Sequence, residues 1–198
     1  RAHTHRPPHP AAPPPAPPIA LSLAVAATRP TGRDVLPFAR SVARIGQTFP
    51  PVAVLALTVP IFGFGAVPTL IALVLYGLLP IFETALTGLD GLDPALMEAA
   101  RGMGMTDRQR LLRVELPLAL PMILSGIRLA AVIGLATATI GSTVAASTLG
   151  EVIISGLLTG NTAYVLQGGL VVSALALLID AGFRHVERGA ARRAGFRS

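Results

Sequence analysis

The sequence predicts an all-α polytopic membrane protein with four full transmembrane helices and one short partial span before them. Only 13% of the 198 residues are charged, about half the share that is usual in soluble domains. The charges also leave long gaps, because none occurs in Ile45–Phe82, Leu129–Gly150 or Val152–Ile179. A bilayer-spanning helix needs about 20 mostly apolar residues, so these gaps are long enough to hold spanning helices.

The composition excludes several functions. Cysteine is absent, which removes disulfides, thiolate nucleophiles and cysteine metal ligands. The net charge of +6 could suit nucleic acid, but the basic residues, all arginines, flank apolar stretches. Aromatic residues make up only 5% of the chain and tryptophan is absent, so base-stacking platforms are not expected. We therefore expect the lipid bilayer as a partner and no nucleic acid.

Residues 1–18 form a proline-rich stretch that predicts a disordered tail. Its histidines, His3, His5 and His9, could bind a metal, but the disordered tail is the preferred interpretation and no metal site is expected. The apolar run Ile19–Ala27 would make a helix of about 14 Å, too short for a hydrocarbon core of about 30 Å. It resembles either a partial first span or the core of a signal peptide, and we favour the partial span.

The transmembrane domain is expected to cover residues 19–182. Its full spans are predicted at 42–62, 67–87, 117–138 and 163–182. The apolar segment 139–162, rich in glycine, serine and threonine, is expected to face outward or re-enter without crossing. The positive-inside rule places segment 29–48 in the cytoplasm, together with a basic tail at 183–198. Two spans then return the polar segment 90–116 to the cytoplasm as well.

Segment 90–116 predicts two short helices separated by a glycine bend. Asp93 suits an N-cap and Pro94 the first helical position. Gly102 and Gly104 are expected to end this first helix, and Thr106 begins the second with a Thr-x-x-Gln capping box. From the residues alone, this segment could be an amphipathic loop that lies on the headgroups with its arginines toward anionic lipid.

The same segment carries a spaced motif, Glu-Ala-Ala, three residues, Gly, nine residues, an aliphatic residue, one residue, Leu-Pro. Its matching positions are Glu98, Ala99, Ala100, Gly104, Leu116 and Pro117, with Val114 in place of the usual Ile. The motif resembles the cytoplasmic loop of permease subunits of binding-protein-dependent, type I ABC importers. Stretches such as "IGQTFPPVAVLAL", "LPLALPMILSGIRLA" and "TLGEVIISGL" extend the resemblance over about residues 35–181. They look most like permeases for glycine betaine, choline and related osmoprotectants.

The resemblance implies a type I importer permease fold and a transport role in the bacterial plasma (inner) membrane, multi-pass with a cytoplasmic C-terminus. In that family the loop docks on an ABC ATP-binding subunit, so docking falls to Glu98, Ala99, Ala100, Gly102, Gly104, Leu116 and Pro117. A second permease copy or paralogue and an extracytoplasmic solute-binding protein are the other implied partners. Open alternatives are an importer permease for another solute, such as an amino acid or a sulfonate, and a non-ABC membrane scaffold or channel.

No catalytic site is expected in this chain. The sequence lacks the Gly-x4-Gly-Lys-Ser/Thr pattern of a P-loop, so it is not predicted to be an enzyme or to bind a cofactor. ATP and Mg would belong to the partner ATPase subunit.

The predicted translocation path contains Arg128, Glu151 and Tyr76. Arg128 lies 11 residues beyond Pro117, about 16 Å along a helix, where a charge usually faces a bundle interior or a cavity. It could meet the carboxylate of a zwitterionic solute, or it could pair structurally with backbone carbonyls or Glu151, and the structural role is preferred. Tyr76 and Tyr164 are the electron-rich rings besides phenylalanine that could contact a quaternary ammonium, so high-affinity recognition is expected in a separate binding protein.

Overall fold

The computed structural model describes residues 16–29, 37, 41, 48–193 and 195, and this part of the chain is helical, with no strand. The main helices are α1 (Ala16–Ala27), α3 (Pro51–Phe62), α4 (Ala66–Asp90), α5 (Pro94–Gly102), α6 (Asp107–Arg110), α7 (Leu116–Gly141), α8 (Glu151–Thr159) and α9 (Thr162–Arg193). The predictions for residues 1–15, including the three histidines, and for residues 42–47 of the 42–62 span lie outside the described residues.

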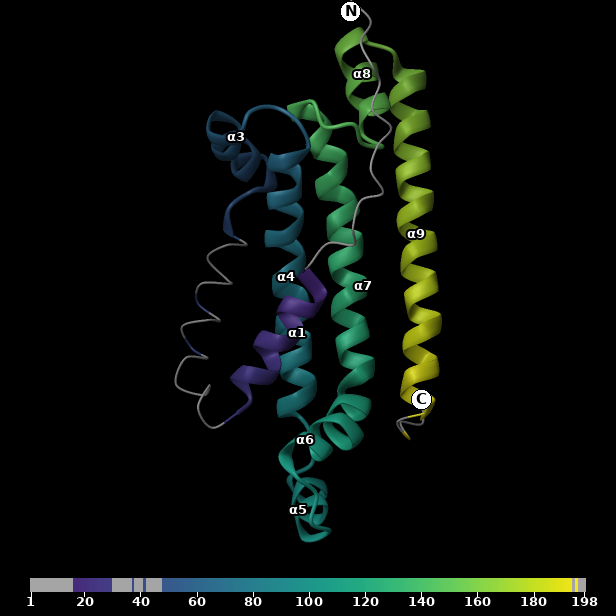
Figure 1. Ribbon diagram of the computed structural model, residues 1–198. Coiled ribbons are helices and arrows are strands. Elements are labelled where there is room, and N and C mark those ends of the chain that lie inside the picture. The colour runs from purple at the N-terminus through teal and green to yellow at the C-terminus, as the bar shows by residue number, and fades with distance from the viewer. Residues whose placement is uncertain (1–15, 30–36, 38–40, 42–47, 194, 196–198) are drawn as a thin grey trace, which may run out of the picture.

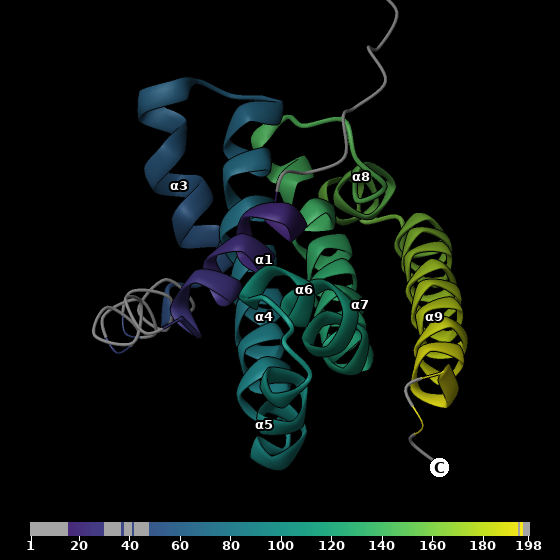
Figure 2. The same ribbon diagram turned by 60° about the horizontal axis from the view of Figure 1, so that its bottom comes forward.

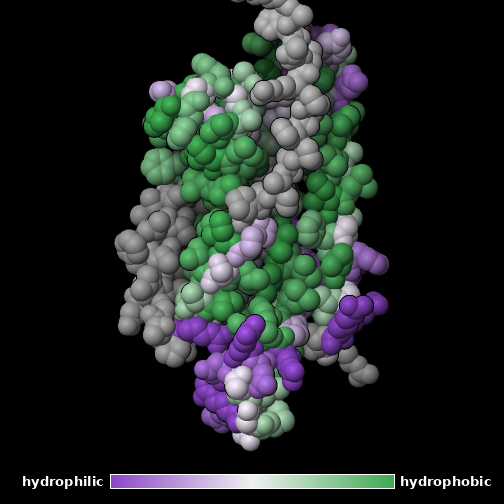
Figure 3. All heavy atoms as spheres, viewed as in Figure 1, coloured by the Kyte–Doolittle hydropathy of each residue, from purple (hydrophilic) through white to green (hydrophobic). Residues whose placement is uncertain are grey.

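Three described helices are long and apolar enough to cross a membrane. They are α4, the continuous helix from Asp107 to Val144 that contains α7, and α9. The three run side by side, with α7 between α4 and α9 (Figure 1). Their flanks form a largely hydrophobic surface, whereas polar residues gather over α5 and α6 (Figure 3). This separation is the one expected for a bundle whose middle faces lipid.

The tightest packing in the bundle is between α4 and α7. Gly126 of α7 lies against the backbone of α4, since a Cβ placed there would be 2.9 Å from the carbonyl oxygen of Pro80 and 3.0 Å from the Cα of Ile81. Gly88 of α4 lies just as close to Ala119 and Met122 of α7. Association of helices in lipid depends on this kind of close contact between small residues. The core beside it is built from Leu79, Ile81, Phe82, Ala85, Leu86, Ala119 and Ile123.

Helix α1 packs obliquely across α4 (Figures 1 and 2). Its buried residues, Ala16, Ala20, Ala24 and Ala27, share one face at helical spacing. The predicted tail boundary at residue 18 is wrong, because Pro17 and Pro18 lie in the first turn of α1. Proline is tolerated there, since the first helical N–H groups have no partner inside the helix. The 12 described residues of α1 extend over about 18 Å, less than a hydrocarbon core of about 30 Å.

Helix α3 occupies the C-terminal part of the span predicted at 42–62. It has 12 residues, about 18 Å of helix, and is too short on its own to cross a core of about 30 Å. The described residues therefore contain three helices of spanning length, against the four predicted for the whole chain.

Two helices extend beyond the spans that the sequence predicts. The last span was expected to end near Gly182, but α9 continues to Arg193, because "HVERGAARR" consists largely of helix-compatible residues. The third span was expected to begin at Pro117, but the helix runs unbroken from Asp107. A π-helical turn at Leu111–Glu115 precedes the proline; it alters the hydrogen-bond register just where proline lacks a donor.

Segment 139–162 contains no spanning helix, in agreement with the prediction. After α7 a 3₁₀ turn covers Ser142–Val144, and Ala145 takes a left-handed conformation with φ of 62°. Helix α8 then has nine residues, about 14 Å, and packs on the start of α9 at the end of the bundle opposite α5 (Figure 1).

We expect Gly126→Ala to destabilise the protein. The added Cβ would lie 1.9 Å from Oγ1 of Thr84 and 2.9 Å from the Pro80 carbonyl oxygen, and overpacking of this kind costs about 1–3 kcal/mol. Thermal unfolding of the purified protein in detergent, followed by circular dichroism, measures the effect. The control is Gly169→Ala in α9, where an added Cβ meets nothing within 4 Å. Equal unfolding midpoints for the two variants would show that the α4–α7 contact is not tight.

Candidate functional site

The polar segment between α4 and α7 projects from one end of the bundle (Figures 1 and 3). Helix α4 ends at Asp90, helix α5 occupies Pro94–Gly102, and α6 begins at Asp107. The C-terminal end of α9 lies at this same end of the bundle (Figure 1). The segment therefore forms a separate, mostly exposed unit whose position is set by the two core helices that it connects.

Both ends of α5 are closed by side-chain and turn hydrogen bonds. Oδ1 of Asp93 accepts from the backbone N–H of Ala95 at 2.9 Å, which confirms the predicted N-cap. At the other end Gly104 has a φ of 77°, a conformation that favours glycine. The N–H groups of Gly104 and Met105 donate to the carbonyls of Arg101 and Ala100, the pattern of a Schellman motif. The predicted glycine bend is therefore confirmed, and its left-handed residue is Gly104.

The capping box that was predicted for the second helix is also present. Oγ1 of Thr106 accepts from the N–H of Gln109 at 3.3 Å, and Oε1 of Gln109 accepts from the N–H of Thr106 at 3.0 Å. These reciprocal bonds satisfy two of the unpaired donors at the start of α6. Hydrogen bonds at the end of α5 and at the start of α6 thus fix the bend between the two helices.

Helix α5 carries an exposed apolar stripe. Leu96, Ala99 and Met103 follow one another at spacings of three and four, so they share one face. All three are exposed, and Met103 is 71% exposed. Ala100 is buried. An exposed apolar stripe on a capped helix, held away from the apolar body of the bundle, has the character of a protein-docking surface.

The remaining loop residues of the motif have different surroundings. Glu98 is exposed and lines a groove on the side of α5 that faces α1 and α4. Gly102 ends α5 with open space beside it. Leu116 packs against the main core cluster, whereas Pro117 is exposed. The motif therefore combines exposed positions with positions that are buried or packed against the core.

The groove beneath α5 has a volume of about 300 Å³ and a charged lining. At its base the carboxylate of Glu115 accepts from Nη2 of Arg29 at 2.7 Å and from Nε of Arg110 at 2.8 Å. Nη2 of Arg110 also reaches Oδ1 of Asp107 at 3.0 Å. The side chains of Arg110 and Glu115 are only 8% and 9% exposed. We call Arg29, Arg110 and Glu115 the Glu115 cluster.

The Glu115 cluster lies ahead of the apolar part of α7. Its carboxylate lies between the guanidinium groups of Arg29 and Arg110, which both donate hydrogen bonds to it. The sequence motif covers the neighbours of Glu115 but did not single it out, and its partner Arg29 lies 86 residues away, beyond any local pattern.

A second ion-pair cluster joins α7 to α9. Nη1 of Arg128 donates to Oδ1 of Asp180 at 2.8 Å, and Nε of Arg128 donates to Oε1 of Glu187 at 2.8 Å. Asp180 also pairs with Arg184. The suggested pairing of Arg128 with Glu151 is wrong, because the partners of Arg128 are Asp180 and Glu187 of α9, whereas Glu151 begins α8. Arg128 and Asp180 are charged residues within otherwise apolar segments, and charges in such segments usually pair with one another. This pattern in the sequence could have predicted their contact.

The structure does not bring the three predicted path residues together. Arg128 pairs with the second half of α9, and Glu151 is exposed at the start of α8. Tyr76 is 6% exposed within a cluster that contains Val54, Leu55, Ala72 and Val144, and its hydroxyl donates to the carbonyl of Phe49. The ring that was expected to contact a solute is thus packed against the chain itself.

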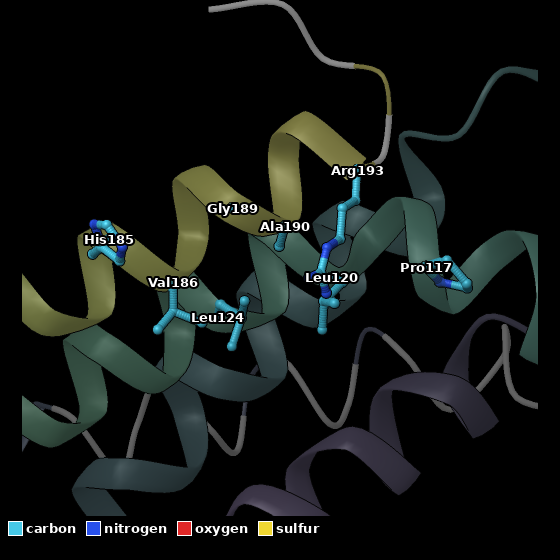
Figure 4. Close-up of a pocket in the computed structure, with 8 residues that line it drawn as sticks. All are labelled: Pro117, Leu120, Leu124, His185, Val186, Gly189, Ala190 and Arg193. Atoms are coloured by element: carbon cyan, nitrogen blue, oxygen red, sulfur yellow. The ribbon is translucent and has the colours of Figure 1, made fainter.

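A larger pocket of about 520 Å³ lies between α7 and α9. Figure 4 shows its lining, with Leu120 and Leu124 on α7 facing Val186 and Ala190 on α9. His185 and Arg193 lie toward its two ends (Figure 4). This lining is mostly apolar and offers little chemistry, so the polar features of the described chain that bear on function are the loop and the two ion-pair clusters.

The spanning helices, the apolar flanks and the capped polar loop together indicate a multi-pass membrane protein. Residues 18–192 match the family described as the binding-protein-dependent transport system inner membrane component, and the chain belongs to that family.

Relatives with printed names agree with this assignment. The chain is 37% identical to the osmoprotectant import permease protein OsmY of Salmonella typhimurium, over 82% of this chain and 69% of that protein. It is 39% identical to the carnitine transport permease protein OpuCB of Listeria monocytogenes, over 81% and 77%. It is 38% identical to the glycine betaine/carnitine/choline permease protein OpuCB of Bacillus subtilis, over 69% and 63%.

Solved structures show the same fold. An inward-facing form of the MetNI methionine ABC transporter matches with a TM-score of 0.74 at 20% identity, over 88% of this chain and 85% of that one. A second inward-facing form matches with a TM-score of 0.75 at 22% identity, over 87% and 86%. The predicted type I ABC importer permease fold is confirmed.

We expect Arg128→Gln to weaken the attachment of α9 to α7. It would leave the carboxylates of Asp180 and Glu187 without their main hydrogen-bond donor, at a cost of about 1–3 kcal/mol. A double-mutant cycle of Arg128→Gln with Glu187→Gln, measured by thermal unfolding in detergent, should give a coupling of about 0.5–3 kcal/mol.

The control for this cycle is Arg188→Gln, which removes an exposed arginine of α9. If Arg128→Gln were as stable as this control but failed to transport solute, Arg128 would act on the translocation path and not as a structural tie.

Proposed function

We propose that the chain is the permease subunit of an ATP-driven importer for glycine betaine, choline or a related osmoprotectant, and that its 90–116 loop docks on a separate ATP-binding subunit. The observation that carries the docking role is the exposed stripe of Leu96, Ala99 and Met103 on a helix capped at both ends. Apolar residues so exposed outside the bundle call for a partner protein.

Docking by α5 follows the helix-in-groove mode of recognition. An amphipathic helix lays its apolar face into a groove, with anchors about one turn apart. The caps at Asp93 and Gly104 keep α5 ordered before it binds, which reduces the entropy lost on docking. Movement of the bound helix would then act on α4 and α7, since the loop is continuous with both.

ATP and Mg would be held by the partner subunit. This chain supplies no P-loop, so we assign it no cofactor and no catalytic residue. Its role is mechanical, the conversion of closure of the ATPase subunits into movement of the spanning helices. Two permease chains, either two copies or a copy and a paralogue, would present two docking loops to two ATPase subunits.

The orientation we propose places the loop and the C-terminus in the bacterial cytoplasm. Arg192 and Arg193 lie in the last turn of α9, at the same end of the bundle as α5 and α6 (Figure 1). Arginines concentrate on the cytoplasmic side of inner-membrane proteins. An extracytoplasmic solute-binding protein would then deliver solute at the opposite end, where α8 lies.

The osmoprotectant class is supported by the named relatives, three of which are permeases for osmoprotectants, for carnitine, or for glycine betaine, carnitine and choline. The burial of Tyr76 in a core cluster is in keeping with high-affinity recognition by the binding protein and not by this chain.

The docking role predicts that Met103→Asp and Gly104→Asp abolish co-purification with the ATP-binding subunit. The first puts a charge on the apolar stripe, and the second forces a side chain into a left-handed turn. The matched control is Leu158→Asp, which places the same charge on an exposed leucine of α8 and should leave capture unchanged. Capture of no ATPase by the wild type, or equal capture by all variants, would refute docking.

The substrate proposal predicts ATP-dependent uptake of glycine betaine, choline or carnitine. Proteoliposomes that contain the complete transporter and its binding protein should accumulate labelled osmoprotectant, and unlabelled betaine should compete. Omission of the binding protein should reduce uptake at least tenfold if the permease itself binds solute weakly. Accumulation of an amino acid or a sulfonate, without uptake of any quaternary ammonium solute, would show that this importer serves another substrate.

A further inference from the structure

We propose that Glu115 is a positioning residue that links the docking loop to α1, so that the movement of the loop is passed to this helix through the Arg29–Glu115 ion pair. The inference rests on the proposed docking function and assigns to Glu115, Arg29 and Arg110 a role in transmitting it.

The need for such a link follows from the order of the helices. Helix α4 runs into the loop and α7 runs out of it, so both are joined to α5 and α6 by a few residues of backbone. Helix α1 ends at Ala27, far from the loop in sequence. Its packing is mainly against α4, through alanines, and small apolar contacts of this kind can slide. A directed contact is required if α1 is to follow the loop.

The geometry at Glu115 supplies a contact of that kind. Oε2 accepts from Nη2 of Arg29 at 2.7 Å, and Oε1 accepts from Nη1 of Arg29 at 3.4 Å and from Nε of Arg110 at 2.8 Å. Both carboxylate oxygens are thus held by guanidinium groups from two different parts of the chain. Charge-assisted bonds with this paired geometry fix direction as well as distance.

The position of the cluster explains why it would transmit movement. Arg110 ends α6 and is 7% exposed, and Glu115 ends the π-helical turn and is equally buried. A buried carboxylate that lost its arginines would be left as an uncompensated charge, so the contact resists separation. The π-helical turn that carries Glu115 lies between the loop and α7, and such turns occur frequently at functional sites.

The test uses the complete transporter with its ATP-binding subunit and binding protein in proteoliposomes. Arg29→Gln and Glu115→Gln should still capture the ATPase subunit, because neither residue lies on the apolar stripe of α5. We expect the solute transported per ATP hydrolysed to fall at least tenfold in both variants. Arg113→Gln is the matched control, since it removes an exposed arginine two residues from Glu115, and it should couple like the wild type.

A covalent replacement of the ion pair separates transmission from simple support. Because the chain has no cysteine, a short bis-maleimide reacts within it only at the two positions introduced by Arg29→Cys with Glu115→Cys. The double variant should be uncoupled before cross-linking, and the cross-link should restore the ratio of transport to hydrolysis. If Glu115→Gln does not reach the membrane, Arg29→Gln and the cross-linked variant decide the question.

The outcomes distinguish this inference from the function on which it rests. If Arg29→Gln couples as well as Arg113→Gln, or if the cross-link does not restore coupling, Glu115 does not transmit movement to α1, whereas docking of the loop still stands. If wild-type protein captures no ATPase subunit, both proposals fail together.

Discussion

Close contact between α4 and α7 is the interaction on which the other described parts of this protein depend. Lipid gives helices no hydrophobic reason to associate, so their contact rests on van der Waals packing where Gly126 meets the backbone of α4 and Gly88 meets α7. Helix α1 packs on α4, and helix α9 packs on α7. The loop joins the end of α4 to the start of the helix that contains α7, so the spacing of these two helices also sets the spacing of the loop's ends.

The outer helices are attached by charges as well as by packing. Helix α1 is linked to the loop end of the bundle through Arg29 and Glu115, and α9 is linked to α7 through Arg128, Asp180 and Glu187. Such pairs are directional and become stronger where water is scarce. Ion pairs can also break and re-form with new partners, which suits helices that move as rigid bodies about a packed core.

The loop illustrates how local chemistry prepares a surface for a partner. Caps at Asp93 and Thr106 and the left-handed Gly104 order the ends of α5 and the start of α6 through local hydrogen bonds. Their order leaves Leu96, Ala99 and Met103 exposed together on one face. For a family member that works with an ATPase subunit, a rigid loop is an advantage, since a flexible one would absorb the movement it has to transmit.

The sequence by itself determined the helical class, the membrane setting, the short first span and the caps of the loop, because hydropathy, the reach of a helix and capping depend on neighbouring residues. It did not show that the helices containing α7 and α9 extend beyond the predicted spans, because Pro117 is accommodated by a π-helical turn and the arginine-rich end of α9 is itself helical. Only the tertiary structure decided that Glu115 pairs with Arg29, 86 residues away. It also decided that Arg128 pairs with Asp180 and Glu187, which lie 52 and 59 residues away. It also decided that Tyr76 is packed in the core, since burial depends on which helices meet.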